Sequence, residues 1–165
     1  MSTALRTILL VVLFAFIMSL QVNLDADKTS TFKMKNALEL AVHDGALALS
    51  SADLANGKIV FDQNAALNNI QASLDTNLNL TSNAGYVYTP NANSFFKNNL
   101  YLVDLEFIDD NVTTTYPYIY NNPNYNISKT VNGPSIIAIM TTDSPRWFNG
   151  SDTIIRQAAV YEYKK

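Results

Sequence analysis

The sequence of 165 residues predicts an α+β protein with a long N-terminal hydrophobic helix, a short second helix and a C-terminal antiparallel β-sheet domain. An uncharged apolar run occupies residues 7–24, the chain contains no proline before residue 52, and all nine tyrosines lie beyond residue 85. Tyrosine favours strands, whereas a stretch rich in Ala, Leu, Lys and Met favours helix. We therefore expect an N-terminal helix over residues 1–51 and an extracytoplasmic α+β unit over residues 52–165, mostly β from about residue 85.

The apolar run TILLVVLFAFIMSLQVNL has the length and composition of a membrane-spanning helix. A helix over this run is about 27 Å long, close to the hydrocarbon thickness of about 30 Å. Arg6 flanks the run on its N-terminal side, so we expect the N-terminus inside and the rest of the chain outside. The side chains expected to form a membrane anchor or a filament core are Ile8, Leu9, Leu10, Val11, Val12, Leu13, Phe14, Phe16, Ile17 and Leu20.

Three interpretations of the run are open. A cleaved signal peptide is common at an N-terminus, but its small-x-small cleavage motif is poorly matched here, with residues 19–21 and 24–26 as the nearest candidates. A permanent anchor fits better, and so does a helix that leaves the membrane for the core of a filament. We expect residues 7–24 to be retained in the mature protein.

The helix is expected to continue past the membrane, from about Ala4 to Ser51, over a length on the order of 70 Å. Apolar or small side chains recur along its second half with the 3.6-residue period of one helix face. These are Met34, Leu38, Ala41, Gly45 and Leu49. A helix of this length needs neighbours for stability, so the face is expected to pack against another surface.

A stripe of small residues, Ala37, Ala41 and Gly45, lies four residues apart on this helix. Small residues at this spacing allow two helices to approach closely. The stripe is compatible with two arrangements, an Ala-rich helix packed on its own domain or tight helix–helix packing against copies of the same chain.

The second helix is expected over residues 63–78, capped by Asp62 and preceded by a turn at Asn56-Gly57 and a β-prone stretch at residues 58–61. Period-2 patterns and turn residues then predict strands. The expected strands are Gly85–Tyr88, Leu100–Ile108, Tyr116–Tyr120, Ser135–Thr141 and Ile154–Tyr163. Residues 135–140 are apolar on both faces, which predicts the central strand, and a turn is expected at Pro90.

The segment KNALELAVHDGALAL, residues 35–49, follows an apolar N-terminal helix and resembles the start of pilin-like proteins of bacterial type IV and Tad-type pili. Asn36-Ala37 and residues 44–48 match the pattern of the TadE-like and TadG-like branch. The resemblance covers only this N-terminal helix, and Leu5 stands where ordinary type IV pilins carry Glu. It implies a pilin-like fold and a structural subunit of an extracellular pilus filament.

The partners that follow from this resemblance are copies of the same chain in a helical homopolymer, the membrane before assembly, and a pilus assembly machinery. The subunit would reach the cell surface after insertion in the cytoplasmic membrane. The alternative is a membrane-tethered accessory protein of a pilus or secretion machine that does not polymerise. A β domain of this size without disulfides is marginal by itself, which also favours assembly.

Composition argues against other classes. The chain has no Cys, and its net charge of −3 with scattered basic residues gives no reason to expect a nucleic-acid partner. His43 is the only His and lies one position before Asp44, but adjacent helical side chains diverge by about 100°, which disfavours a catalytic pair. Glu39 with His43 is only half of a metal-binding motif.

One acidic cluster, Asp104, Glu106, Asp109 and Asp110, lacks the spacing of a calcium loop, and we expect a solvated strand end there. The sequence therefore predicts no enzymatic activity, no metal site and no cofactor. A tethered hydrolase is the third class that we considered, and little in the sequence favours it.

Overall fold

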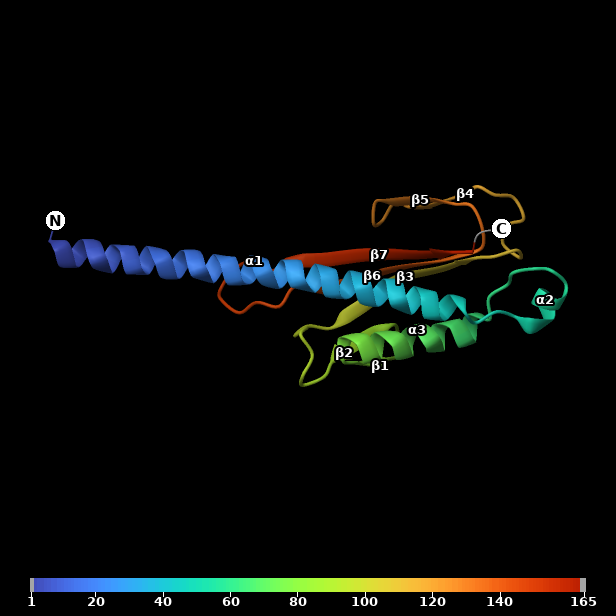
Figure 1. Ribbon diagram of the computed structural model, residues 1–165, viewed down its shortest axis with the longest axis horizontal. Coiled ribbons are helices and arrows are strands. Elements are labelled where there is room, and N and C mark those ends of the chain that lie inside the picture. Colours follow the sequence, from blue (N-terminus) through green and yellow to red (C-terminus); the bar gives the residue numbers. More distant parts are fainter. Residues whose placement is uncertain (1, 164–165) are drawn as a thin grey trace.

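Within residues 2–163, three helices precede seven strands, which confirms the α+β class (Figure 1). The computed structural model describes residues 2–163. In chain order the elements are α1 (Thr3–Ala46), α2 (Ser51–Ala55), α3 (Gln63–Leu78), β1 (Leu80–Asn83), β2 (Val87–Pro90), β3 (Leu100–Ile108), β4 (Tyr118–Asn122), β5 (Ile127–Val131), β6 (Ser135–Asp143) and β7 (Ile154–Glu162).

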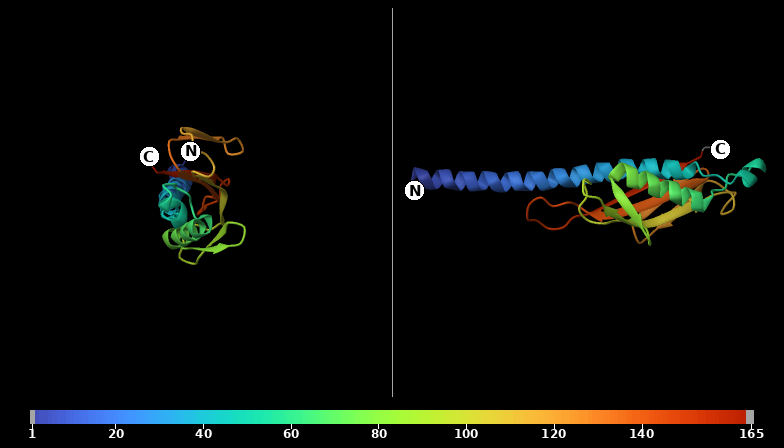
Figure 2. Two further views of the ribbon diagram at one scale, coloured as in Figure 1. Left: turned by 90° about the vertical axis from the view of Figure 1, so that its right-hand side faces the viewer. Right: turned by 90° about the horizontal axis from the view of Figure 1, so that it is seen from below.

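The first helix, α1, is half free and half packed. Its N-terminal half extends away from the rest of the molecule, while its C-terminal half lies along α3 and the sheet (Figures 1 and 2). Ser2 caps its start, because the Ser2 side chain accepts a hydrogen bond from the Leu5 backbone N–H at 3.4 Å. The buried face repeats every three or four residues, as expected for an amphipathic helix. It consists of Asn23, Ala26, Ser30, Met34, Ala37, Leu38, Ala41, Val42, Gly45 and Ala46.

The expected end of this helix at Ser51 is wrong, because α1 ends at Ala46. The following backbone pairs with residues 60–62 instead of continuing the helical hydrogen bonds. The Ser50 N–H donates to the Val60 carbonyl at 2.8 Å, and the Asp62 N–H donates to the Ala48 carbonyl at 2.9 Å. This pairing starts the turn that brings α3 back along α1.

The second predicted helix corresponds to α3, and its predicted bounds are confirmed. Asp62 is the cap, with its side chain accepting from the Ala65 N–H at 3.1 Å. The helix ends at Leu78, and the following C-cap residue Asn79 has a φ of +54°, in the left-handed region that suits a helix C-terminus. Ala66, Ile70 and Leu74 on its inner face are fully buried beneath α1 and the sheet.

The main sheet has the order β1-β2-β3-β6-β7, and every neighbouring pair is antiparallel. The prediction that residues 135–140 form the central strand is wrong in one respect. The middle strand is β3, and β6 lies next to it, paired with β3 on one side and β7 on the other. A register shift between Leu102 and Asp104 marks a bulge in β3.

The apolar character of β6 on both faces has a structural cause. On one face, Ile136, Ala138 and Met140 join the core beneath α1 and α3. On the other face, Ile137 belongs to a second cluster with Tyr120 and residues of the β4–β5 hairpin and β3. Because the hairpin covers the outer face of the sheet, β6 is buried from both sides.

Three expectations about strands and turns need correction, and two strands of the structure were not expected. The expected strand at residues 85–88 begins two residues later, since Gly85 and Tyr86 have φ of +74° and +59° and form the turn between β1 and β2. Pro90 ends β2 instead of forming a turn. The strand expected over residues 116–120 is β4, shifted by two residues, and strands β1 and β5 were not expected. β5 carries three exposed polar residues in a row, Ser128 to Thr130, so its sequence lacks an apolar alternation.

Candidate membrane anchor and its docking to the domain

The candidate functional site is the free half of α1. In residues 7–24 the only buried side chain is that of Asn23. The helix is long and apolar enough to cross a membrane. Because each large apolar side chain gains about 1.5–3 kcal/mol on leaving water, this surface strongly favours an apolar surrounding. The large apolar side chains that the sequence assigned to an anchor are all exposed along the free helix, namely Ile8, Leu9, Leu10, Val11, Val12, Leu13, Phe14, Phe16, Ile17 and Leu20.

A loop between β6 and β7, residues 144–153, docks on α1 where the apolar run ends. The Asn23 side-chain amide donates to the Phe148 carbonyl at 3.1 Å, and the Asn23 Oδ1 accepts from the N–H groups of Trp147 and Phe148, each at 3.3 Å. This contact was missed in the sequence analysis. Asn23 is one of the few polar residues of this uncharged run, and its amide is the one signal that could have indicated a partner there.

An ion pair reinforces the same contact one helical turn further along α1. The Arg146 guanidinium lies 2.5 Å from the Asp27 carboxylate and donates to the Ser151 carbonyl at 3.0 Å. It also donates to the Thr153 hydroxyl. Both charged side chains of the pair are mostly buried, so the guanidinium is held by several oxygen atoms at once. The loop therefore joins the domain to α1 at the end of the apolar run 7–24.

The small-residue stripe lies inside the molecule. Ala37, Ala41 and Gly45 are buried, and a Cβ added at Gly45 would lie 2.6 Å from the Ile70 Cγ1 atom and 3.3 Å from the Ala66 carbonyl oxygen. The close approach that the stripe allows is thus between α1 and α3 of one chain. The sequence left two arrangements open, and the structure has the first of them, an Ala-rich helix packed on its own domain.

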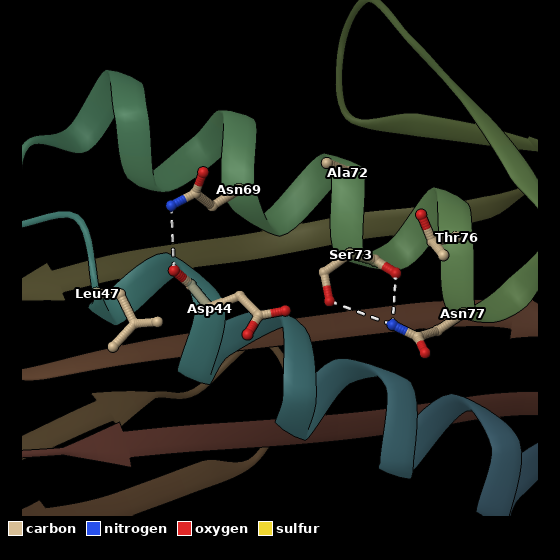
Figure 3. A pocket seen from close by; sticks show the side chains of 7 residues that line it. All are labelled: Asp44, Leu47, Asn69, Ala72, Ser73, Thr76 and Asn77. Atoms are coloured by element: carbon tan, nitrogen blue, oxygen red, sulfur yellow. Dashed lines mark hydrogen bonds between the residues drawn. The ribbon is translucent and has the colours of Figure 1, made fainter.

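An open groove of about 430 Å³ lies between the C-terminal end of α1 and α3 (Figure 3). It is lined by Asp44, Leu47, Asn69, Ala72, Ser73, Thr76 and Asn77. Its polar groups bond to one another, with Asn69 donating to the Asp44 carbonyl at 3.2 Å and Asn77 donating to the Ser73 carbonyl at 2.8 Å. Asp44 is the single titratable residue in this lining, so the groove holds no acid–base pair.

The only His is placed differently from the expectation. The His43 Nδ1 atom lies 3.4 Å from the Asp44 Oδ1 atom, although adjacent helical side chains usually diverge. Both side chains are partly exposed, and the His43 ring also packs edge-on against Tyr161 at 5.1 Å between ring centroids. Glu39, one turn earlier, pairs with Lys35 at 3.9 Å. Within residues 2–163, no group of three or more His, Asp or Glu residues is arranged to hold a metal ion.

The acidic cluster is not simply a solvated strand end, and that expectation is corrected for two of its members. Asp109 and Asp110 are buried, and they accept hydrogen bonds from the backbone of the segment before α3. The Asp110 carboxylate accepts from the Ile59 N–H at 2.8 Å, and the Asp109 carboxylate accepts from the Phe61 N–H at 3.2 Å. The two carboxylates thus fix the turn between α2 and α3 to the end of β3.

Replacing Asp109 with Ala is expected to lower the free energy of unfolding by about 2 kcal/mol, because the buried Phe61 N–H loses its acceptor. Asp109 also accepts from the Asn111 N–H at 3.0 Å, so its loss loosens the turn after β3. Thermal unfolding in detergent, followed by circular dichroism, measures the effect. Asp152→Ala, at an exposed position, is the matched control, and equal melting temperatures for the two variants would contradict this role of Asp109.

The other two residues of the acidic cluster, Asp104 and Glu106, lie on the outer face of the sheet, which the β4–β5 hairpin covers. The Tyr120 hydroxyl donates to the Asp104 carboxylate, which also accepts from the Asn122 amide at 3.0 Å. Burial, together with this hydrogen bond, raises the pKa of Tyr120 to about 12. Burial and the neighbouring Asp104 raise the pKa of Glu106. These bonds attach the hairpin to β3.

Comparison with known proteins gives no match to a family model, to a curated protein sequence or to a solved structure. The function is therefore inferred from the residues and their geometry.

Proposed function

We propose that this protein is a structural subunit that is anchored in a membrane by residues 7–24 and assembles, through the same helix, into an extracellular pilus-like filament. The observation that carries the proposal is the free half of α1, an exposed apolar helix continuous with the helix that packs into the domain (Figure 1). A single rigid element then joins the membrane, or a filament core, to the solvent-facing domain.

Two features of the free half support transfer between these surroundings. No charged residue lies between Arg6 and Asp25, so the helix can leave lipid without carrying an ion into a protein core. Its apolar side chains are exposed around the helix rather than on one stripe. A helix that is apolar all round suits burial among several neighbours or in lipid.

The small-residue stripe adds no support to polymerisation, because α3 of the same chain already covers it. The proposed subunit contacts are therefore made by residues 7–24. The domain would face solvent on the outside of the filament, with its own core closed by α1, α3 and the sheet.

Electron microscopy of sheared surface material, with mass spectrometry of its peptides, tests the proposal. The expected result is a filament whose main component is this chain, including peptides from the anchor. Finding the chain only in the membrane fraction, with no filament containing it, would favour the non-polymerising accessory protein instead.

Residues 7–24 are expected to remain in the mature protein. Cleavage after residue 21 or 26 would cut α1 beside Asn23 and Asp27, the two residues that hold the loop 144–153. N-terminal sequencing of the mature chain measures this directly. A mature form that begins near Gln21 or Asp27 would contradict the prediction and leave a secreted domain with no anchor.

A further inference from the structure

Two aromatic side chains project from the loop that docks on α1. Trp147 and Phe148 are 55% and 48% exposed, although both belong to large apolar residue types. Their loop, residues 144–153, is the part of the domain that reaches furthest toward the N-terminal end of α1 (Figures 1 and 2). The exposed aromatic pair therefore lies on the side of the domain that faces the apolar half of the helix.

The position of this pair along the helix follows from its hydrogen bonds. The N–H groups of Trp147 and Phe148 both donate to the Asn23 side chain, so their backbone lies at the level of Asn23. Asn23 is the penultimate residue of the run 7–24, whose length of about 27 Å nearly equals the hydrocarbon thickness of about 30 Å. In a membrane spanned by this run, the aromatic pair lies at the outer boundary between hydrocarbon and headgroups.

The loop is held firmly enough for this position to be defined. Asn23 makes three hydrogen bonds to it, and Arg146 pairs with Asp27. Gly150 packs so closely on α1 that an added Cβ would lie 3.2 Å from the Asn23 Nδ2 atom. Residues 147–153 of the loop are exposed, and Trp147 and Phe148 are the two large apolar side chains among them.

The chemistry of the pair fits a membrane interface. Trp is enriched at the headgroup level, where its ring contacts acyl chains and its indole N–H remains hydrated. The exposed Lys97 places its ammonium 5.6 Å from the centroid of the Trp147 ring. A cation beside an aromatic ring at this level can also attract lipid phosphate groups.

We propose that the loop 144–153 is a second membrane contact, in which Trp147 and Phe148 insert among the headgroups of the outer leaflet. This inference rests on the membrane anchor of the proposed function and adds a constraint to it. One spanning helix leaves the domain free to tilt against the membrane in any direction. A second contact on one side of α1 restricts this tilt and so fixes which part of the domain lies nearest the membrane before assembly.

Trp147 is the single Trp in the chain, so its fluorescence reports on this position alone. The full chain is reconstituted in vesicles of phosphatidylcholine with a minority of phosphatidylglycerol. Separate samples carry a nitroxide quencher at the headgroup, near the top of the acyl chain, or near the bilayer centre. Most of the emission is expected to be lost with the first two quenchers and little with the third.

The matched control moves the single Trp to a distant exposed site in the variant Trp147→Phe/Ile119→Trp. Ile119 is exposed on β4, in the hairpin on the outer face of the sheet. Its emission is expected to be insensitive to all three lipid quenchers and sensitive to aqueous acrylamide. The variant Asn23→Ala, which removes the docking bonds, is expected to weaken the headgroup quenching of Trp147.

Resistance of the reconstituted chain to alkaline carbonate extraction is measured in parallel, because it reports on the helix alone. A chain that resists extraction while Trp147 is quenched only by acrylamide would overturn the second contact and leave the anchor intact. A chain that is extracted would instead overturn the anchor of the proposed function. Lipid-insensitive emission that becomes protected only in filaments would assign the aromatic pair to a subunit contact and would also overturn the inference.

Discussion

Replacing Gly45 with Leu is expected to destabilise the folded domain, since α3 leaves no space for a side chain at this position. Even a Cβ atom would lie 2.6 Å from the Ile70 Cγ1 and 2.8 Å from its Cδ1, and Ile70 is fully buried. Forcing extra atoms into a packed core costs about 1–3 kcal/mol or more, and the better helix propensity of Leu recovers less than about 1 kcal/mol. The expected net loss is about 2 kcal/mol, a fall in melting temperature of about 4–8 °C for a chain of this size.

Thermal unfolding in detergent measures this loss, and two further variants identify its cause. Asn36→Leu adds the same side chain at an exposed position of α1 and is expected to leave the melting temperature nearly unchanged. Ile70→Ala alone opens a cavity, and adding Gly45→Ala to it is expected to restore part of the stability by filling that cavity. If Gly45→Leu left the melting temperature unchanged but blocked assembly, the stripe would contact another copy.

The small-residue stripe illustrates where sequence reasoning reached its limit. A spacing of four between Ala37, Ala41 and Gly45 indicates close helix packing, but it carries no information about which helix is the partner. The partner helix is determined by the turn at residues 47–62, where backbone pairing brings α3 back along α1. That pairing in turn depends on the buried carboxylates of Asp109 and Asp110, which lie far away in the sequence.

Elements with strong local signals were predicted well. The bounds of α3 follow from an apolar period with Asp62 as its cap, and β3 follows from its long run of β-prone residues. Short elements without such signals were missed or shifted. β5 has a single fully buried side chain, Val131, because it covers the outer face of the sheet as part of a hairpin.

The exposed apolar half of α1 could be predicted from composition alone, because no other part of the chain is uncharged and apolar over such a length. Its connection to the domain could not. The loop 144–153 is held beside Asn23 and Asp27 by the pairing of β6 with β7, which is a long-range feature of the fold. Arg146 and Trp147 therefore carried no recognisable signal in the sequence.

Replacing Leu13 with Asp is expected to impair both membrane insertion and assembly. Asp near the centre of a spanning helix costs about 2.5–3.5 kcal/mol, and the lost Leu contribution adds roughly 0.5 kcal/mol. A filament core does not remove this cost, because burying an unpaired carboxylate among apolar helices is at least as unfavourable as placing it in the membrane. The expected result is a large decrease in membrane-associated chain after carbonate extraction, together with the loss of filaments in sheared material.

Two controls separate the effect of the charge from other effects. Leu13→Val keeps the site apolar and is expected to insert and assemble normally. Thr114→Asp adds the same charge at an exposed position between β3 and β4 and is expected to be tolerated. Normal membrane association and normal filaments from Leu13→Asp would contradict the role of the run. A fragment beginning at Lys28 lacks the apolar half of α1 but keeps the helix face from Ser30 to Ala46 that packs on the domain. If this fragment formed the same filaments, the apolar half of α1 would be a membrane anchor only.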